Sequence, residues 1–358
     1  MSQVNSKIIE IYDINLIEEL FDQLPKKYEY HTPFLSKTWL CNWLRTTNHK
    51  PLLVTATCNK NNELKGFAFF GVVSSCFGKT LYLNQTGEHT QDQIWIEHND
   101  IICLREERTL LLDSMLTELS RIPRLSRIFI RTSLSNDWQN SCFLEPNIEE
   151  EKNWFVDLKE KTTYETTISK NCRSSIRRSN RLIEDKFGKI MISIAKESEL
   201  PEILLKIAKL HQKRWDKSDY GSGFSNPKFV EFHQQLMGTA GGPEGPNVKV
   251  LTITAGDFTL GYLYMLTMKK DALFYLSAIN YVDLGNQFKP GLSMHFAAIN
   301  LLSELGFERY DFLAGYARYK ESMANNVYSV YHIELYSKSI ISRISQKLHK
   351  IKTYFNKT

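Results

Sequence analysis

Residues 285–323 read GNQFKPGLSMHFAAINLLSELGFERYDFLAGYARYKESM and contain the clearest structural signals in the chain. Pro290 suits the first turn of a helix, because the N–H group that proline lacks has no partner there. Apolar residues then recur at helical spacing: Leu292, Phe296, Ile299 and Leu302. Gly306 is a typical helix stop. The pattern predicts a helix that begins near Pro290 and ends before Gly306.

The start of this predicted helix favours an anion. The first backbone N–H groups of a helix have no partner within it, and the helix dipole makes that end positive. Lys289 adds a cation, and Gly291 lets a ligand come close to the backbone. Phosphate groups commonly bind at such helix starts. We therefore predict a phosphate site at Lys289, Gly291, Leu292 and Ser293.

A short apolar strand follows the helix and leads into a loop of cations and phenols. Residues 310–313 are predicted to form this strand, and Gly315 then releases the chain. Residues 316–320 read YARYK, so two cations and two phenols are presented together at the end of one strand.

Five motifs in the chain form an ordered set. They are SKNCRSSIRRSNRL at residues 169–182, LGYLY at 260–264, KPGLSMH at 289–295, YDFLAG at 310–315 and RYK at 318–320. The set resembles the GNAT-superfamily acyltransferases of the cellulose-biosynthesis group (CelD/BcsL-like, also called BioF2-like), which are related to FemAB and FemX. The resemblance is densest over residues 164–325 and weaker over the first half of the chain.

This resemblance implies a fold and an activity. The fold would be α/β with mixed sheets, built from two GNAT-like domains in tandem as in FemX. The activity would be that of an N-acetyltransferase-like acyltransferase acting on an amine of a small molecule, sugar or envelope precursor. Its acyl donor would be acetyl-CoA, another acyl-CoA or an acyl-carrier protein.

The resemblance also assigns a role to Lys320, which matches the lysine of the family's YK pair. That lysine acts near the reacting carbonyl or phosphate; the alternative is an exposed lysine. Two departures from the family matter. The ordinary GNAT phosphate signature, a Gln or Arg followed by spaced glycines, is absent, so the Lys-Pro-Gly entry must replace it. Tyr316 stands where the family usually has an acid, so no general base is identified.

Acyl transfer from a thioester to an amine needs a donor for the developing oxyanion and an acceptor for the amine proton. Tyr316 and Tyr319 are the candidate donors to the thiolate or oxyanion. Asp311 and His295 are the candidates for relaying the proton. Each has an alternative, because Asp311 can cap neighbouring backbone N–H groups and His295 can simply pack within its helix.

A pantetheine arm needs a strand edge to pair with. GNAT folds splay their central sheet at the strand that residues 274–279 match here. We expect this strand, which includes Tyr275 and Ser277, to receive the pantetheine arm.

The first half of the chain shows the same element order in weaker form. Residues 52–57 and 64–73 form a predicted hairpin, and residues 250–255 and 259–268 form another. We interpret this as a diverged duplication. The polar, acidic stretch 136–153 is predicted as the boundary. The predicted domains are a degenerate N-terminal GNAT-like domain at 1–150, a GNAT acyltransferase domain at 151–336 and a basic amphipathic helix at 337–358.

The composition of the chain argues against membrane-spanning, secreted and metal-binding proteins. No run approaches the roughly 18 to 20 apolar residues of a bilayer span, and the first residues lack the build of a signal peptide. We therefore expect a cytoplasmic protein. The six cysteines are scattered without short pairing, so we expect reduced, buried thiols. The nine histidines include no His-Glu-x-x-His motif, so no metal site is expected.

Charge is divided unevenly along the chain. Residues 1–150 hold 15 Lys and Arg against 19 Asp and Glu, a net −4, and residues 151–358 hold 30 against 21, a net +9. The basic half is expected to bind the anionic ligand. One face of a predicted helix carries Lys170, Arg173, Arg177, Arg178 and Arg181. We predict that Arg177 and Arg178 guide a phosphorylated cofactor or acidic carrier; the alternative is a solvated basic face.

The last residues of the sequence predict an amphipathic helix. Its apolar stripe consists of Ile340, Ile344, Leu348, Ile351 and Phe355. Such a helix can lie on an anionic membrane, here the inner face, or pack on its own domain, and the sequence leaves both open.

Two rival functions remain beside acyl transfer. A FemX-like aminoacyltransferase would draw on charged tRNA and bind RNA in a strongly salt-dependent way. A catalytically inactive GNAT scaffold would bind an acyl carrier without turnover, and Tyr316 in place of an acid keeps this alternative open.

Overall fold

The computed structural model describes residues 4–25, 32–48, 50–159, 163–216, 221–239, 246–340, 342–344 and 346. The chain forms two compact units: unit 1 comprises Met1–Glu151 and Val330–Thr358, and unit 2 comprises Lys152–Ser329. Each unit is a mixed sheet with helices, so the predicted α/β fold class is confirmed. Two strands, β7 (Asn147–Asp157) and β13 (Asn326–Tyr336), contribute residues to both units.

In unit 1 the strand order is β1-β2-β3-β4-β6-β13. The strands are β1 (Val4–Ile9), β2 (Leu52–Cys58), β3 (Leu64–Ser75), β4 (Gly78–Leu83), β5 (Ile102–Cys103) and β6 (Leu125–Ser133). The helices are α1 (Ile14–Gln23), α2 (Lys37–Thr46) and α3 (Arg108–Leu119), with 3₁₀ turns at Pro33–Leu35, Asp92–Ile94 and Arg105–Glu107. Strand β5 pairs with β3, and the β4–β6 pair is parallel.

Alternation along β3 builds two apolar layers in unit 1. Phe67 and Phe69 face α1 and α2, where the Trp43 ring meets Phe69 edge-on at 6.0 Å between centroids. Ala68 and Phe70 face the apolar residues of α3 on the other side. The Trp43 side chain is buried in this layer.

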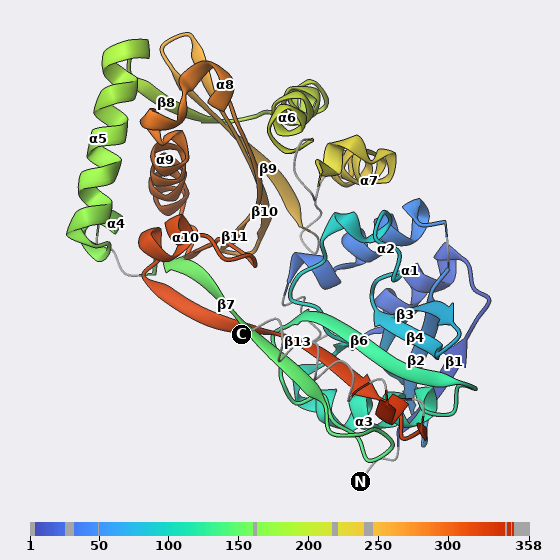
Figure 1. Ribbon diagram of the computed structural model, residues 1–358. Helices are drawn as coiled ribbons and strands as arrows, with labels where there is room; N and C mark the ends of the chain where they lie inside the picture. Colours follow the sequence, from blue (N-terminus) through green and yellow to red (C-terminus); the bar gives the residue numbers. More distant parts are fainter. Residues whose placement is uncertain are drawn as a thin grey trace. The chain divides into compact units, whose positions relative to one another are not determined.

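In unit 2 the strand order is β7-β12-β11-β10-β9-β8. The strands are β8 (Ile190–Ile194), β9 (Asn247–Ala255), β10 (Phe258–Met268), β11 (Asp271–Ile279) and β12 (Arg309–Asp311). The helices are α4 (Tyr164–Thr167), α5 (Lys170–Phe187), α6 (Leu200–Trp215), α7 (Pro227–Gly238), α8 (Tyr281–Leu284), α9 (Pro290–Glu304) and α10 (Arg318–Met323). Within this unit α5 and α9 lie on one face of the sheet, and α6 and α7 lie on the other (Figure 1).

Local sequence signals set the limits of the helices in unit 2. Helix α9 begins at Pro290, as predicted, and ends before Gly306, whose φ of +83° favours glycine. Helix α5 begins where the Ser169 hydroxyl accepts from the Cys172 N–H. Its apolar face is buried, at Cys172, Ile176 and Ile183 among others, and the basic face points away.

The acidic stretch 136–153, predicted as the domain boundary, includes residues 147–153 of β7, whose acidic side chains are mostly exposed while its second half is buried. Two other expectations are corrected. The strand predicted at 310–313 ends at Asp311, because Leu313 adopts a left-handed φ of 56°. Not every thiol is buried, since Cys76 is exposed and Cys142 is half-buried, although all six are free.

Trp215 is 37% exposed at the end of α6. The predicted C-terminal helix falls largely on residues 347–358, which lie outside the described residues. Within the described ranges, none of the helices combines the length and apolar composition that crossing a bilayer requires.

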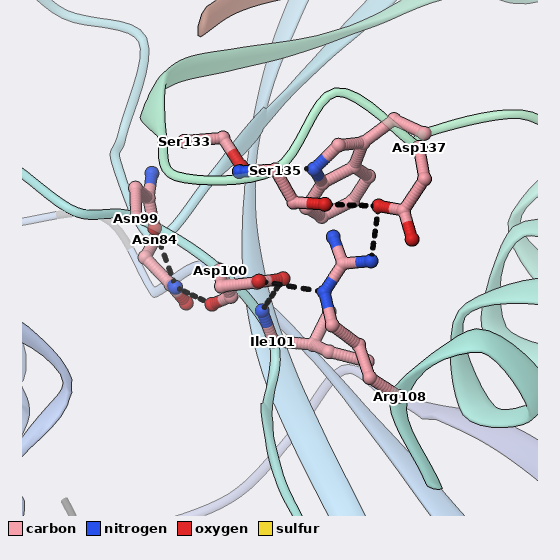
Figure 2. Close-up of polar contacts among 9 residues, drawn as sticks. Asn84, Asn99, Asp100, Ile101, Arg108, Ser133, Ser135 and Asp137 are labelled. Carbon is pink, nitrogen blue, oxygen red and sulfur yellow. Dashed lines mark hydrogen bonds and ion pairs between the residues drawn. The ribbon is translucent and has the colours of Figure 1, made fainter. Parts of the chain in front are cut away.

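A largely buried ion network in unit 1 joins the first residue of α3 to Asp100 and Asp137 (Figure 2). Arg108, the first residue of α3, donates from Nε to Asp100 at 2.6 Å and from Nη1 to Asp137 at 2.5 Å. Arg108 and Asp100 are largely removed from water, whereas the Asp137 side chain is 47% exposed. Burial raises the pKa of Asp100 and the Arg108 guanidinium lowers it, so the charged pair depends on both partners.

Replacing Arg108 with Met should therefore lower the free energy of unfolding by about 3–5 kcal/mol, because Asp100 is left as an uncompensated buried charge. The matched control is Asp137→Asn, which removes the half-exposed partner and should cost less than about 1 kcal/mol. Urea denaturation followed by circular dichroism measures both. Equal losses in the two variants would show that burial of Asp100 does not determine the cost.

Candidate functional site

The sheet of unit 2 opens between β11 and β12. These strands pair in parallel at three positions only, from Asp271–Arg309 to Leu273–Asp311. From Phe274 onward, β11 pairs with β10 alone among the described strands. Tyr275 is an extra residue in that pairing, because Tyr264 lies opposite Leu276 and Met265 opposite Phe274. A bulge of this kind bends its strand, so it turns β11 away from β12.

The start of α9 lies beside this opening. A Cβ added at Gly291 would lie 3.5 Å from Cδ1 of Ile279, the last residue of β11, and 3.7 Å from the Tyr281 hydroxyl. Lys289 precedes the helix with a left-handed φ of 45° and an exposed side chain. The Leu292 N–H donates to the Lys289 carbonyl at 3.0 Å, so this group is already paired, contrary to the prediction of an open N–H there. The Gly291 N–H lies at the start of the helix, which we call the mouth of α9 (Lys289, Pro290 and Gly291).

Helix α5 holds the entry to α9 in place. The Ser179 hydroxyl lies 2.5 Å from the Phe288 carbonyl and 3.2 Å from the Lys289 carbonyl. It also lies 2.6 Å from the Ser293 hydroxyl, and both serines are buried. The side chain of Ser293 is therefore used to anchor the helix. It is therefore not available for the predicted contact to phosphate.

A buried aromatic cluster surrounds His295, in the second turn of α9. His295 is buried, and its Nδ1 lies 2.7 Å from the Tyr310 hydroxyl. The Tyr319 ring stacks on His295 at 5.2 Å and 20°, and the Phe274 ring meets His295 edge-on at 4.6 Å. Phe312 completes the cluster at 5.4 Å. The structure thus brings α9, α10 and β11 together around one imidazole.

The electrostatics of this cluster are set by burial. Burial and, to a smaller extent, the nearby Lys320 ammonium lower the pKa of His295 to about 3, so the imidazole is neutral at physiological pH. Burial raises the pKa of Tyr319, with a smaller increase from the Tyr281 phenol and a decrease from Arg214. Tyr319 therefore keeps its proton and can donate a hydrogen bond.

Lys320 and Asp311 are both engaged with the protein. The Lys320 Nζ donates to the carbonyls of Leu313 at 3.2 Å and Ala314 at 2.6 Å, and its side chain is buried, which corrects the alternative of an exposed lysine. Asp311 is buried, pairs with Arg309 at 2.8 Å and accepts from the Leu313 N–H at 2.8 Å. Both side chains therefore shape the loop that leaves β12.

The other predicted residues lie outside this cluster. Tyr316 is 71% exposed and rests edge-on against Trp154 at 5.7 Å. Arg177 is exposed and ion-paired with Glu165 at 2.9 Å. Arg178 is exposed on the same helix, and Ser277 is half-buried on β11. Among the described residues, His, Cys, Asp and Glu form no group of three or more suited to a metal ion.

Sequence reasoning missed two residues at the mouth, Tyr281 and Arg214. The guanidinium carbon of Arg214 lies 4.0 Å from the centroid of the Tyr281 ring and 5.2 Å from that of Trp215. The HQKRW run at the end of α6 carried a basic and aromatic signal. No local spacing could join it to α8, because the two segments meet only in the folded unit.

Unit 1 also has one parallel pair of strands, β4 and β6, which corresponds to β11 and β12 of unit 2. In unit 1, however, the gap beyond the paired residues is bridged by the protein. Strands β4 and β6 pair in parallel as far as Tyr82 and Phe129. Beyond them, the fully buried Asn99 donates from its backbone N–H to the Thr132 carbonyl at 3.0 Å and from Nδ2 to the Leu83 carbonyl at 2.8 Å.

The neighbourhood of this bridge is filled by the protein itself. Asn84 donates to the Asn99 side chain at 2.8 Å, as Figure 2 shows. The first residue of α3 is Arg108 with its two carboxylates, whereas the mouth of α9 has Pro290 and Gly291. The open site is therefore a property of unit 2.

Residues 170–321 match the family model described as "Acetyltransferase (GNAT) domain". The match lies within unit 2 and includes β11, the mouth of α9, and Tyr319 and Lys320 of α10. Among curated proteins, none matches the sequence.

Solved structures share the fold across nearly the whole chain. A conserved protein of unknown function from Bacteroides thetaiotaomicron has a TM-score of 0.55 at 9% identity, covering 92% of this chain and 99% of that one. The C-terminal domain of a putative lysylphosphatidylglycerol synthetase from Agrobacterium fabrum has 0.52 at 11%, covering 93% and 95%. FemX has 0.52 at 9%, covering 91% and 96%. The predicted FemX-like architecture is therefore confirmed at the level of the fold.

Three buried histidines of unit 2 should make stability depend on pH. Burial lowers the pKa of His211 to about 4 and those of His233 and His295 to about 3. The unfolded chain takes up these protons near pH 6.5, so stability is full above that pH and is lost as pH falls toward 3. Each histidine should contribute a slope of about 1.4 kcal/mol per pH unit.

Thermal unfolding measured between pH 4 and 7 checks this expectation. His233→Phe should reduce the slope, because the imidazole that resists protonation is gone. The variant also loses the contact of Nδ1 to the Tyr264 hydroxyl at 3.0 Å, which lowers stability by a similar amount at each pH and leaves the slope to report the imidazole. Exposed His89→Phe is the control and should leave the slope unchanged. A His233→Phe slope equal to that of the native chain would contradict the expectation.

Proposed function

We propose that unit 2 is an acyltransferase that moves an acyl group from a phosphopantetheine thioester to an amine. The observation that carries the proposal is the parting of β11 from β12 beside the mouth of α9. A free strand edge and a helix start at one place suit the two parts of such a donor, its amide-bearing arm and its phosphates. The match of residues 170–321 to a GNAT acetyltransferase model supports the same reaction class.

The donor would bind in two segments. The pantetheine arm would pair with β11 beyond Phe274, along the stretch that includes Tyr275 and Ser277. The phosphates would lie at the Gly291 N–H with the Lys289 ammonium beside them. Leu292 and Ser293 would shape this mouth without donating to the phosphates, because the Leu292 N–H is paired with the Lys289 carbonyl and the Ser293 hydroxyl with Ser179. The basic face with Arg177 and Arg178 would attract the donor over a longer range.

In the proposed reaction, the amine nitrogen attacks the thioester carbonyl carbon and the carbon–sulfur bond breaks. The Tyr319 hydroxyl donates a hydrogen bond to the departing thiolate, which then takes a proton from solvent, and the amine proton passes to solvent. Tyr319 suits this role because burial keeps it protonated, and His295 holds its ring by stacking. Lys320 would act by fixing the Leu313 and Ala314 carbonyls at the end of β12.

The remaining candidates have weaker support. His295 and Asp311 are poor proton acceptors in this arrangement, because the imidazole resists protonation and the carboxylate is held by Arg309. Tyr316 is exposed and would reach the reaction only by a movement of its loop. We therefore assign the general base to neither carboxylate nor imidazole, and solvent takes the proton.

The finer assignments belong to the same proposal. The KPGLSMH and YDFLAG motifs support the CelD/BcsL-like group and an acceptor amine on a small molecule, sugar or envelope precursor. Residues 1–150 would be a degenerate domain and residues 151–336 the catalytic one. Acyl-CoA and acyl-carrier protein are the proposed donors, in the cytoplasm, with residues 337–358 available for contact with the inner membrane face.

Transfer of an aminoacyl group from charged tRNA is the second candidate, favoured by the fold shared with FemX. It predicts tight RNA binding whose logarithm falls linearly with the logarithm of salt concentration. A thermal-shift comparison of acetyl-CoA, long-chain acyl-CoA, acyl-carrier protein and bulk tRNA separates the donors, because each stabilises only a chain that binds it. Donor binding without thiol release on a panel of amines would identify an inactive scaffold.

Gly291→Ala tests the proposed phosphate site directly. The added methyl meets its neighbours at ordinary van der Waals distances, so the fold should gain about 0.5–1 kcal/mol of stability from the better helix former. The same methyl would stand where phosphates approach the Gly291 N–H and should weaken CoA binding about tenfold or more. Calorimetric titration and thermal unfolding measure the two effects, which have opposite signs.

Gly238→Ala is the matched control for this substitution. It adds the same methyl at the end of α7, where nothing lies within 4 Å, so it should leave CoA affinity unchanged. Unchanged affinity in both variants would place the phosphates somewhere other than the mouth of α9.

A further inference from the structure

We infer that Arg214 is an oxyanion-binding residue of the unit 2 site and determines a preference for a phosphate- or carboxylate-bearing substrate. Arg214 lies in the last turn of α6, outside the motif set that pointed to acyl transfer. The inference rests on the proposed function for the identity of the ligand. The evidence for anion binding comes from the surroundings of the guanidinium itself.

The guanidinium is held by two aromatic rings. Its central carbon lies 4.0 Å from the centroid of the Tyr281 ring and 5.2 Å from that of Trp215. Stacking of this kind fixes the plane of an arginine while leaving the N–H groups on its edge available. It also accounts for Trp215, a large aromatic side chain that remains 37% exposed instead of entering the core.

The edge of Arg214 is not used by the protein. Across the ranges that the structure describes, the Arg214 guanidinium forms neither an ion pair nor a hydrogen bond. Other arginines of unit 2 are used differently: Arg309, which also stacks on rings, pairs with Asp311 at 2.8 Å. A fixed guanidinium with open donors suits bidentate contact to a phosphate or carboxylate.

The position of Arg214 connects it to the site. Tyr281, which it covers, places its hydroxyl 3.7 Å from where a Cβ of Gly291 would be, at the mouth of α9. Arg214 also acts on Tyr319, whose pKa it lowers against the dominant effect of burial. The cation therefore lies within electrostatic range of both the predicted phosphate position and the predicted proton donor.

The anion can come from either substrate. If the anion is a phosphate of the acyl donor, Arg214 and Lys289 would both contact the donor. A carboxylate or phosphate on the acceptor would place the amine beside the thioester. Both sources share the chemistry of an oxyanion held in a planar fork, and binding experiments separate them.

The test compares Arg214→Gln and Arg214→Lys with Lys213→Gln in the full chain. Lys213 is the matched control, an exposed cation one residue earlier on α6. Calorimetry measures affinity for CoA, for inorganic pyrophosphate and for pantetheine, which lacks phosphates. Steady-state kinetics measures KM and kcat for amines with and without an acidic group.

A donor phosphate is identified if Arg214→Gln weakens CoA and pyrophosphate binding about 10- to 100-fold and leaves pantetheine unchanged. An acceptor anion is identified if CoA affinity is retained and KM rises by a similar factor only for acidic amines. In either case Arg214→Lys should recover only part of the loss, because an ammonium lacks the planar fork.

Equal behaviour of Arg214→Gln and Lys213→Gln for every ligand would overturn the inference. Failure of the proposed function looks different: the native chain would then neither bind CoA nor transfer an acyl group. Pyrophosphate binding still tests Arg214 in that case, because it depends on the anion and not on the reaction.

Discussion

Three residue pairs between β11 and β12 are the constraint on which the site of unit 2 depends. Buried backbone N–H and C=O groups need hydrogen-bond partners. Two strands of a sheet can therefore part only where another group, such as a ligand or water, supplies those partners. The short parallel ladder joins the strands at one end, and the bulge at Tyr275 turns β11 away from β12 beyond it. The freed edge of β11 thus becomes a surface that an extended ligand can complete.

The opening persists because α9 is held rigidly beside it. Ser179 ties the helix entry to α5, and His295 ties its second turn to Tyr310. These buried polar groups are paired, which avoids the cost of burying a hydrogen-bonding group without a partner. Tyr319 then reaches the site through its stacking on His295, so the position of the phenol follows from the position of the helix.

The two units show how one element order gives opposite outcomes. In unit 1, Asn99 bridges β4 and the end of β6 with its backbone and side chain, and Arg108 occupies the start of α3. In unit 2, the equivalent helix starts with Pro290 and Gly291, and the strand edge beside it is free. The charge of the halves agrees with this division, since the acidic half carries the filled gap and the basic half the open one. Topology alone therefore does not decide whether the gap between the two strands is open; the residues in the gap do.

The sequence by itself determined the features that depend on neighbours along the chain. The limits of α9, the hairpins and the buried face of α5 follow from helical spacing, turns and caps within short windows. Tertiary structure decided which polar groups remain available. It buried Lys320 against two carbonyls, paired Asp311 with Arg309, placed Tyr319 and not Tyr316 against the cluster, and set Arg214 on Tyr281. These outcomes depend on contacts between residues far apart in sequence, and burial there changes both the hydrogen-bond partners and the pKa of each group, which local periodicity does not encode.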